Sequence, residues 1–122
     1  MVDSTGVARS HARQERRYRR FKLKLPVHLL VQYDQGIVEL DAISRDVSIG
    51  GLLLDCPLLI PTHSPVNFVI NLRSRSLRAL ELLGDGTVVR VETRTFDGNV
   101  AVAVECNSPI AQIETYLADD LS

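Results

Sequence analysis

Apolar residues recur at every second position along several short stretches of this chain, and turn-forming residues separate the stretches. Val27, Leu29, Val31 and Tyr33 alternate with the residues between them, and Asp34-Gln35-Gly36 follows with the chemistry of a hairpin turn. Because successive side chains of a strand point to opposite faces, this period predicts a strand with one face on a core. We therefore expect a mainly β fold.

The same period, with the positions of glycine and proline, predicts the remaining strands and turns. Residues Arg73 to Leu83 fit either a strand or a short helix, and we favour the strand. The predicted order after the first turn is a strand at 37–47, a strand beginning at Leu52, a surface connection from Pro57 to Pro65, a strand at 66–72, the strand at 73–83, a turn at Asp85-Gly86, a strand at 87–95, a turn at 96–99 and a strand at 100–106.

The C-terminal residues carry a helical pattern. Ser108-Pro109 is typical of a helix N-terminus, and apolar residues then recur at helical spacing at Ile110, Ile113, Tyr116 or Leu117, and Leu121. Short strands with frequent turns, followed by one helix, predict an antiparallel β-barrel with the helix packed against it. A chain of 122 residues is suited to a single domain of this kind.

The net charge of −1 conceals two parts of opposite charge. Residues 1–24 contain eight Arg or Lys and two acids, which leaves six basic and thirteen acidic residues for the rest of the chain. Residues 1–14 show no apolar period and are expected to form a flexible tail, and residues 15–24 form a basic arm ahead of the first strand. Such an arm favours an anionic partner, or docking onto the protein's own acidic surface.

Two motifs flank the first predicted hairpin. Arg16 and Arg20 form an RxxxR pair in the arm, and Asp46, Ser48 and Gly51 form a DxSxxG element that begins at the end of the second predicted strand. In this order and at these places, the two motifs resemble those of the PilZ domain, a bacterial family that binds the second messenger cyclic di-GMP.

The resemblance covers nearly the whole chain, from about Glu15 to the C-terminus. It implies a PilZ domain at 15–122, preceded by the tail at 1–14. Within the domain it implies the RxxxR arm at 15–24, a six-stranded antiparallel β-barrel at 25–107 and a C-terminal α-helix at 108–121.

The resemblance also implies ligand-binding roles for Arg16, Arg20, Asp46, Ser48 and Gly51, with Arg17, Arg19 and Gly50 as further candidates. An arginine fork matches phosphate oxygens or the O6 and N7 acceptors of guanine. A carboxylate accepts from the N1 and N2 edge of guanine, a hydroxyl donates to phosphate, and glycine permits close approach of a ligand. The implied ligand, cyclic di-GMP, offers phosphate and guanine twice.

The arginine register has alternatives. Arg9 with Arg13 and Arg13 with Arg17 also satisfy RxxxR. We favour Arg16 and Arg20 because the segment from Phe21 into the first strand resembles the segment that follows the motif in the family.

The downstream motif also has a structural interpretation. Asp46 and Ser48 are residue types whose side chains bond the backbone of their own turn, and this role is compatible with ligand binding. The Gly50-Gly51 pair permits backbone angles that are closed to other residues, and both glycines are expected to have a structural role with or without ligand.

Our leading functional hypothesis is a cyclic di-GMP receptor or adaptor that signals through changed contacts with an unidentified effector protein, with biofilm formation and motility as family-level processes. A first alternative is a PilZ-like interaction module that binds no nucleotide. A second is a small nucleic-acid-binding barrel, which the acidic body and the few aromatic residues disfavour. An enzyme is not expected, because no nucleophile–base set or carboxylate pair stands out.

Other sequence features bound the cellular context. No run approaches the roughly 18 apolar residues of a membrane helix, and residues 1–20 contain no signal-peptide core, so we expect a cytoplasmic protein. We expect it to be a monomer or weak homodimer. Cys56 and Cys106 are expected to be buried free thiols. His11, His28 and His63 lack metal-ligand spacing, and neither a metal nor a cofactor is expected.

Overall fold

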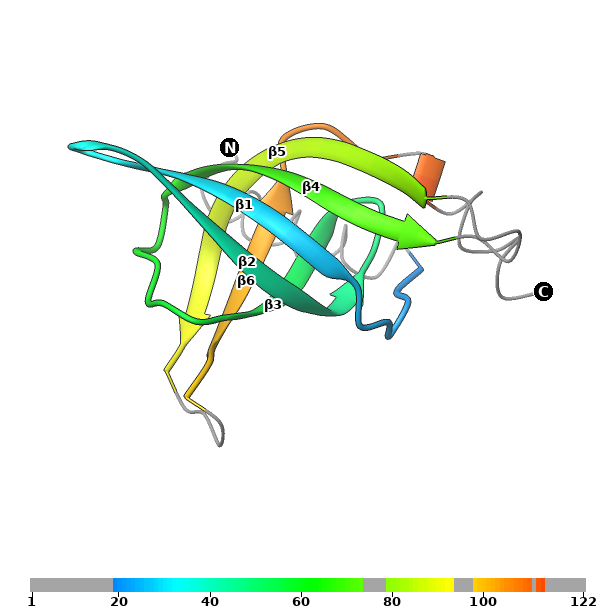
Figure 1. The fold of residues 1–122 in the computed structure, drawn as a ribbon, viewed down its shortest axis with the longest axis horizontal. Helices are drawn as coiled ribbons and strands as arrows, with labels where there is room; N and C mark the ends of the chain where they lie inside the picture. The colour runs from blue at the N-terminus through cyan, green and yellow to red at the C-terminus, as the bar shows by residue number, and fades with distance from the viewer. Residues whose placement is uncertain (1–18, 74–78, 94–97, 111, 114–122) are drawn as a thin grey trace, which may run out of the picture.

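The strands form a closed antiparallel barrel (Figure 1). A computed structural model describes residues 19–73, 79–93, 98–110 and 112–113. Its strands are β1 (Pro26–Tyr33), β2 (Gly36–Val47), β3 (Gly51–Cys56), β4 (Pro65–Arg73), β5 (Ala79–Glu92) and β6 (Val100–Cys106). They pair in the order β1-β2-β3-β6-β5-β4, and β4 pairs with β1 to close the barrel. The predicted six-stranded antiparallel barrel is confirmed.

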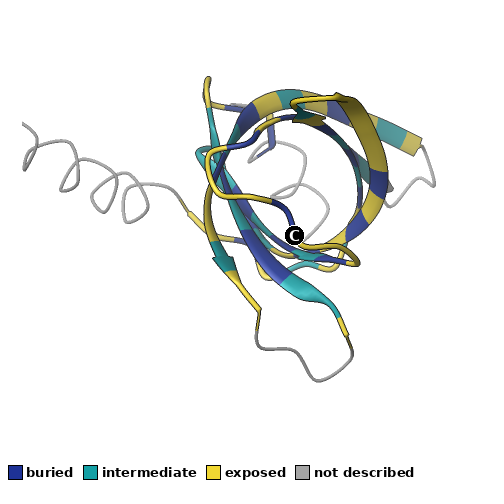
Figure 2. Cartoon of the chain, turned by 90° about the vertical axis from the view of Figure 1, so that its left-hand side faces the viewer, coloured by how far each residue is buried: buried dark blue, intermediate teal, exposed yellow. Residues whose placement is uncertain are grey.

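Side chains alternate between the interior of the barrel and its outer surface, as the alternating colours along the strands show (Figure 2). Val27, Leu29 and Val31 point into the core from β1, as their spacing predicts. Their partners on β2 are Ala42, Leu40 and Val38, of which Ala42 and Leu40 are buried as well. On β1 the apolar period therefore identifies the face that lines the core.

One predicted turn is wrong. Asp85 and Gly86 lie in the middle of β5, a single strand of 14 residues that combines parts of two predicted strands. Gly84 faces Phe68 of β4, and a Cβ at residue 84 would lie 2.5 Å from the Phe68 ring. At Gly86 a Cβ would collide with the backbone carbonyl of Glu105. These glycines allow close packing inside a curved strand, a role that local sequence does not distinguish from a turn.

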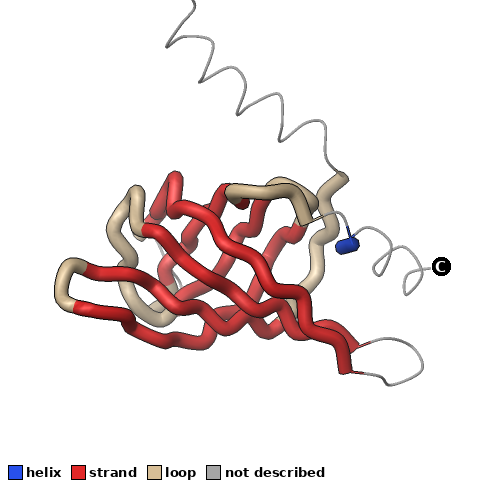
Figure 3. The backbone as a smooth tube through the Cα atoms, turned by 90° about the horizontal axis from the view of Figure 1, so that it is seen from above, coloured by secondary structure: helices blue, strands red, loops and turns tan. Residues whose placement is uncertain are grey.

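The predicted surface connection between β3 and β4 is present, but it also contributes to the core (Figures 1 and 3). Ile60 is fully buried, and the backbone of Ser64 accepts a hydrogen bond from Val88 of β5. Ile110 and Ile113, which follow β6, join the same apolar core. These three isoleucines extend the core beyond the strands.

Several predictions concern residues outside the described ranges. The tail at 1–14, arm residues 15–18 and most of the expected helix at 108–121 belong to these, and only residues 112–113 are described as helical (Figure 3). Among the described residues, no helix has the length and apolar character needed to cross a membrane.

Candidate functional site

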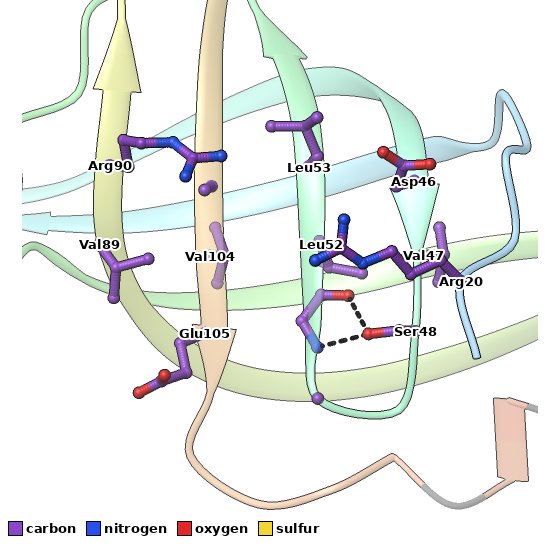
Figure 4. Close-up of a pocket in the computed structure, with 13 residues that line it drawn as sticks. Arg20, Asp46, Val47, Ser48, Leu52, Leu53, Val89, Arg90, Val104 and Glu105 are labelled. Atoms are coloured by element: carbon purple, nitrogen blue, oxygen red, sulfur yellow. Dashed lines mark hydrogen bonds between the residues drawn. The ribbon is translucent and has the colours of Figure 1, made fainter. Parts of the chain in front are cut away.

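A pocket lies on the outer face of the barrel, over the neighbouring strands β2, β3, β6 and β5 (Figure 4). It contains about 660 Å³ of space not filled by protein atoms, part of which is open solvent. The residues that line it are Arg20, Asp46, Val47, Ser48, Gly50, Gly51, Leu52, Leu53, Val89, Arg90, Ala103, Val104 and Glu105. Five of the sequence-predicted site residues are among them.

Ser48 closes the turn between β2 and β3. Its Oγ accepts a hydrogen bond from the Gly51 N–H (3.2 Å) and lies 3.3 Å from the Gly51 carbonyl oxygen, to which it donates. The Ser48 N–H donates to the same carbonyl at 2.9 Å. The turn-capping interpretation is thus confirmed for Ser48, whose hydroxyl already has a donor and an acceptor role in the turn.

The same turn also accepts backbone hydrogen bonds from the end of β6 and from the segment that follows it. The carbonyl of Ile49 accepts from the Ile110 N–H, and the carbonyl of Gly50 accepts from the Cys106 N–H, both at 2.9 Å. The turn is thus held by its own hydrogen bonds and by those from the end of β6 and the segment after it. Its backbone therefore forms a preorganised wall of the pocket.

The two glycines of this turn do not use the positive φ angles that glycine permits. Positive φ occurs at Gly36, Gly98 and His63 among the described residues, and neither Gly50 nor Gly51 shares it. Gly51 is instead required by close packing, because a Cβ there would lie 2.6 Å from the backbone oxygen of Val104 on β6. Only the position of the residue against the neighbouring strand reveals this reason.

Asp46 reaches the pocket through a β-bulge. Ser44 faces the core, and a regular alternation would turn residue 46 inward as well. The register with β3 shifts between Ser44 and Asp46, so Arg45 is an extra residue and Val47 takes the next buried position. The bulge therefore places the Asp46 carboxylate outside the barrel, and within the described residues it has no hydrogen bond or ion pair.

The arm is docked against the end of β2. Phe21 and Val47 exchange two backbone hydrogen bonds of 2.9 Å, and the Phe21 side chain lies in the core. Ser44 is fully buried, and its Oγ accepts from the Leu25 N–H at 2.9 Å and donates to the Leu23 carbonyl at 2.5 Å. These contacts fix the chain directly after Arg20 and bring Arg20 to the pocket.

The other arginine candidates are not brought into the described pocket. Arg16 and Arg17 lie outside the described residues. Arg19 is exposed and its guanidinium carbon lies 4.9 Å from the centre of the Phe21 ring, a cation–π geometry. Arg19 thus covers the residue that anchors the arm.

Three residues of the far wall were missed by sequence reasoning. Arg90, Glu105 and Ala103 line the pocket from β5 and β6. Arg90 lies two positions after the buried Val88, so a regular alternation predicts that it also points into the barrel. The local sequence pattern therefore does not indicate that Arg90 contacts a ligand at the surface. The bulge that changes its direction is visible only in the pairing of β5 with β6.

Across residues 19–73, 79–93, 98–110 and 112–113, no group of three or more His, Cys, Asp or Glu side chains is arranged to hold a metal ion. The polar groups of the pocket are instead hydrogen-bonding groups, with guanidinium donors and carboxylate acceptors on both walls.

Comparison with protein families gives one match over most of the chain. The family model described as PilZ domain matches residues 14–119. A comparison with curated proteins finds no match.

Solved structures with the same fold include two PilZ domains and a motility inhibitor. The PilZ domain of YcgR from Escherichia coli with c-di-GMP has a TM-score of 0.62 at 15% identity, covering 88% of this chain and 93% of that one. The PilZ domain of CeSA from a cellulose synthesizing bacterium has a TM-score of 0.50 at 17% identity, covering 82% and 96%.

The inhibitor of motility MotI/DgrA from Bacillus subtilis has a TM-score of 0.63 at 16% identity. The match covers 85% of this chain and 47% of MotI/DgrA, so the present chain corresponds to about half of that protein. At these identities the three likenesses establish the barrel fold.

Proposed function

This chain belongs to the PilZ domain family, and we propose that it is a cyclic di-GMP receptor whose ligand lies between the RxxxR arm and the DxSxxG turn. One observation carries the proposal: a single pocket is lined by Arg20 from the arm and by Asp46, Ser48 and Gly51 from the turn. These residues come from stretches more than 20 positions apart, and the docking of Phe21 on Val47 brings them together.

The ligand roles follow from the chemistry of each group. Asp46 accepts hydrogen bonds from the N1 and N2 edge of guanine, which a site for phosphate alone does not require. Arg20 and Arg16 donate to phosphate or to guanine acceptors. Ser48, whose hydroxyl is committed to the turn, acts mainly by holding the backbone in place. Gly50 belongs to the same edge.

The net charge of the described pocket lining indicates that further arginines of the arm are needed to bind the ligand. Arg20 and Arg90 are balanced by Asp46 and Glu105, so these four residues carry no net formal charge. A ligand with two phosphates needs more positive charge than this, and Arg16, with Arg17 as a further donor, would supply it. Removing either half of the site should therefore weaken binding.

Part of the entropy cost of binding is met before the ligand arrives. Fixing about five backbone residues costs on the order of 5–10 kcal/mol, and micromolar binding corresponds to roughly −8 kcal/mol. Residues from Phe21 to Leu25 are already held to β2 by backbone and Ser44 hydrogen bonds. In the proposal, ligand binding fixes the arm residues before Phe21 against the barrel.

The signal is a changed surface for an effector protein. When ligand bridges the arm and the barrel, the arm covers the pocket and presents a different face to a partner. This adaptor role is supported by the fold shared with YcgR and MotI/DgrA, one solved with c-di-GMP and the other described as an inhibitor of motility. Within the proposal the protein is cytoplasmic, is no enzyme, and is a monomer or weak homodimer.

The alternative is a PilZ-like interaction module without nucleotide. It is favoured by the structural roles of Ser48 and Gly51, since a turn closed by Ser48 and a glycine facing Val104 are needed for the barrel even without ligand. Asp46 distinguishes the two proposals, because it has no structural partner among the described residues.

Calorimetric titration with cyclic di-GMP tests the proposal. The wild type should bind saturably and select cyclic di-GMP over GTP at two salt concentrations. Arg16→Ala, Arg20→Ala and Asp46→Ala should each weaken binding by about tenfold or more, since each removes a charged hydrogen-bonding group. Arg45→Ala is the matched control, because Arg45 is exposed, lies outside the pocket and pairs with Asp55.

The absence of binding by the wild type, confirmed by a second method, would replace the receptor by the interaction module. The ordering step has a separate test in amide hydrogen exchange of residues 9–24. Protection should rise on saturation with cyclic di-GMP, and unchanged exchange there would contradict the switch while leaving the binding site intact.

A further inference from the structure

We propose that Arg90 is a ligand-contacting residue that binds acceptor atoms of the nucleotide from the wall of the pocket opposite Asp46. The proposal deepens, and rests on, the cyclic di-GMP site proposed above. Arg90 belongs to no motif, but the register of the sheet, the bulge in β5, the surroundings of its guanidinium group and the floor of the pocket all point to a ligand contact.

Asp46 and Arg90 occupy the two ends of one cross-strand row. Asp46 pairs with Leu53, Leu53 pairs with Ala103, and Ala103 pairs with Arg90. Neighbouring strands lie about 4.7–4.9 Å apart, so three steps separate the two charged residues by about 14 Å along the sheet. The Asp46 carboxylate and the Arg90 guanidinium group thus face one pocket from opposite sides. At this separation the two residues do not form a cross-strand pair.

A second bulge brings Arg90 to this position. Val88 is fully buried, and regular alternation would turn residue 90 into the barrel. The β5–β6 register shifts between Val88 and Arg90, so Val89 is the extra residue and Val91 packs on the core. Bulges often redirect a side chain beside a functional site. Here, the bulges of β2 and β5 each turn a charged residue out of the barrel into the same pocket.

The Arg90 guanidinium has no structural partner among the described residues. No hydrogen bond or ion pair there involves it, and it is exposed. By contrast, Arg45 on the β2 bulge forms an ion pair with Asp55 at 2.7 Å. In Figure 4, Arg90 extends from β5 towards β3, and Arg20 points towards β3 from the other side. Two guanidinium groups therefore converge above the floor of the pocket.

The floor between them suits the face of a base. Leu53 and Ala103 lie between the charged ends of the row, and the small side chain of Ala103 leaves space over β6. An apolar floor flanked by an acceptor and a forked donor matches a guanylate, whose phosphate and guanine O6 and N7 atoms all accept hydrogen bonds.

The test is calorimetric titration of cyclic di-GMP into Arg90→Ala, with wild type and Arg45→Ala as references. Arg90→Ala should bind about tenfold to a hundredfold more weakly, with an unchanged unfolding midpoint because the side chain has no structural partner. Arg45→Ala should change the affinity by less than about threefold. Equal affinity of Arg90→Ala and wild type would overturn the inference and leave the receptor proposal standing.

Equal losses in Arg90→Ala and Arg45→Ala would also overturn it, since a general charge effect would then explain both. Failure of the wild type to bind would overturn both proposals and is recognised before any variant is made.

Arg90→Lys identifies the atoms that are contacted. Lysine keeps the charge and loses the planar fork. Recovery of affinity in Arg90→Lys, with the salt dependence of the wild type, would assign the contact to a phosphate. Affinity as low as that of Arg90→Ala would assign it to the O6 and N7 edge of guanine, which requires a bidentate donor. Either result supports a contact from Arg90.

Discussion

A Cβ atom at Gly51 would lie 2.6 Å from the backbone carbonyl oxygen of Val104 on the adjacent strand β6. Both atoms belong to backbone segments held by the β3–β6 ladder, in which Gly51 pairs with Glu105 and Leu52 with Val104. Neither can move aside as the end of a flexible side chain would. The last glycine of the DxSxxG motif is therefore a condition for joining β3 to β6.

Replacing Gly51 by alanine should destabilise the protein by about 1–3 kcal/mol, as overpacking in a well-packed region does. Urea unfolding measures this free energy. Leu53→Ala is the control, because Leu53 faces the same side of β3 and already carries a Cβ. A Gly51→Ala variant as stable as the wild type would show that β6 can shift and would remove the packing explanation.

Replacing Ser44 by alanine should loosen the arm. The change leaves the Leu25 N–H and the Leu23 carbonyl without their buried partner, at a cost of about 1–3 kcal/mol in the free energy of unfolding. Amide exchange of residues 21–25 should accelerate, and affinity for cyclic di-GMP should fall because Arg20 is less firmly placed.

The matched control for this change is Ser64→Ala. Ser64 is also buried, and its hydroxyl donates to the Pro61 carbonyl at 2.7 Å, in the connection before β4. It should lower stability without accelerating exchange in the arm. Equal acceleration in both variants would indicate general destabilisation rather than loss of a local clamp.

His28 should titrate above its ordinary pKa of 6.5. Its Nδ1 lies 2.9 Å from an Asp41 oxygen and its Nε2 lies 2.8 Å from a Glu39 oxygen. A neutral imidazole has one N–H, so both bonds are satisfied only by the imidazolium. The hydrogen bond to Asp41, followed by that to Glu39, raises the pKa of His28. NMR titration of the ring protons measures this value.

The stability that follows from this shift is present below pH 6.5 and is lost as the pH rises through the pKa of the folded state. A variant with Glu39→Gln and Asp41→Asn should return the pKa towards 6.5, and its stability should differ from that of the wild type at acidic pH more than at alkaline pH. A His28 pKa at or below 6.5 in the wild type would contradict the paired geometry.

Cys56 and Cys106 should react slowly with a thiol reagent at pH 8 in the native protein. Both are free, and burial is the main cause that raises each thiol pKa to about 12, with Asp55 adding to the effect at Cys56 and Asp85 and Glu105 at Cys106. Because the thiolate is the reactive form, both thiols should be released for reaction only on unfolding. Rapid native reaction would show that one of them is accessible and ionised. Cys106→Ser, with one thiol fewer, identifies which.

The strands with a strong apolar period were predicted well. The expected free thiols are present, although Cys106 is only partly buried. The error at Asp85-Gly86 has a specific cause. Gly84 and Gly86 leave space for the Phe68 ring and for the β6 backbone. The sequence alone does not distinguish a glycine that is required for close packing from one that is required for a turn.

The candidate site was predicted in part. Asp46, Ser48 and Gly51 were found because they form a contiguous motif, and Arg20 because it belongs to a second one. Arg90 and Ser44 were missed, since neither belongs to a motif and their roles depend on strands that are distant in sequence. The parts played by Arg16 and Arg17 stay predictions, because these residues lie outside the described structure.

Short-range chemistry in the chain was sufficient for the mainly β fold, the first hairpin, the burial of alternate residues and the family, because period, turn residues and motifs are local properties. Tertiary structure decided the direction in which Asp46 and Arg90 point. A bulge, which reverses the alternation of side chains along a strand, is defined only by the pairing of that strand with its neighbour. The directions of Asp46 and Arg90 therefore depend on the register of β2 with β3 and of β5 with β6. Those two registers bring both side chains to the same pocket on one face of the barrel.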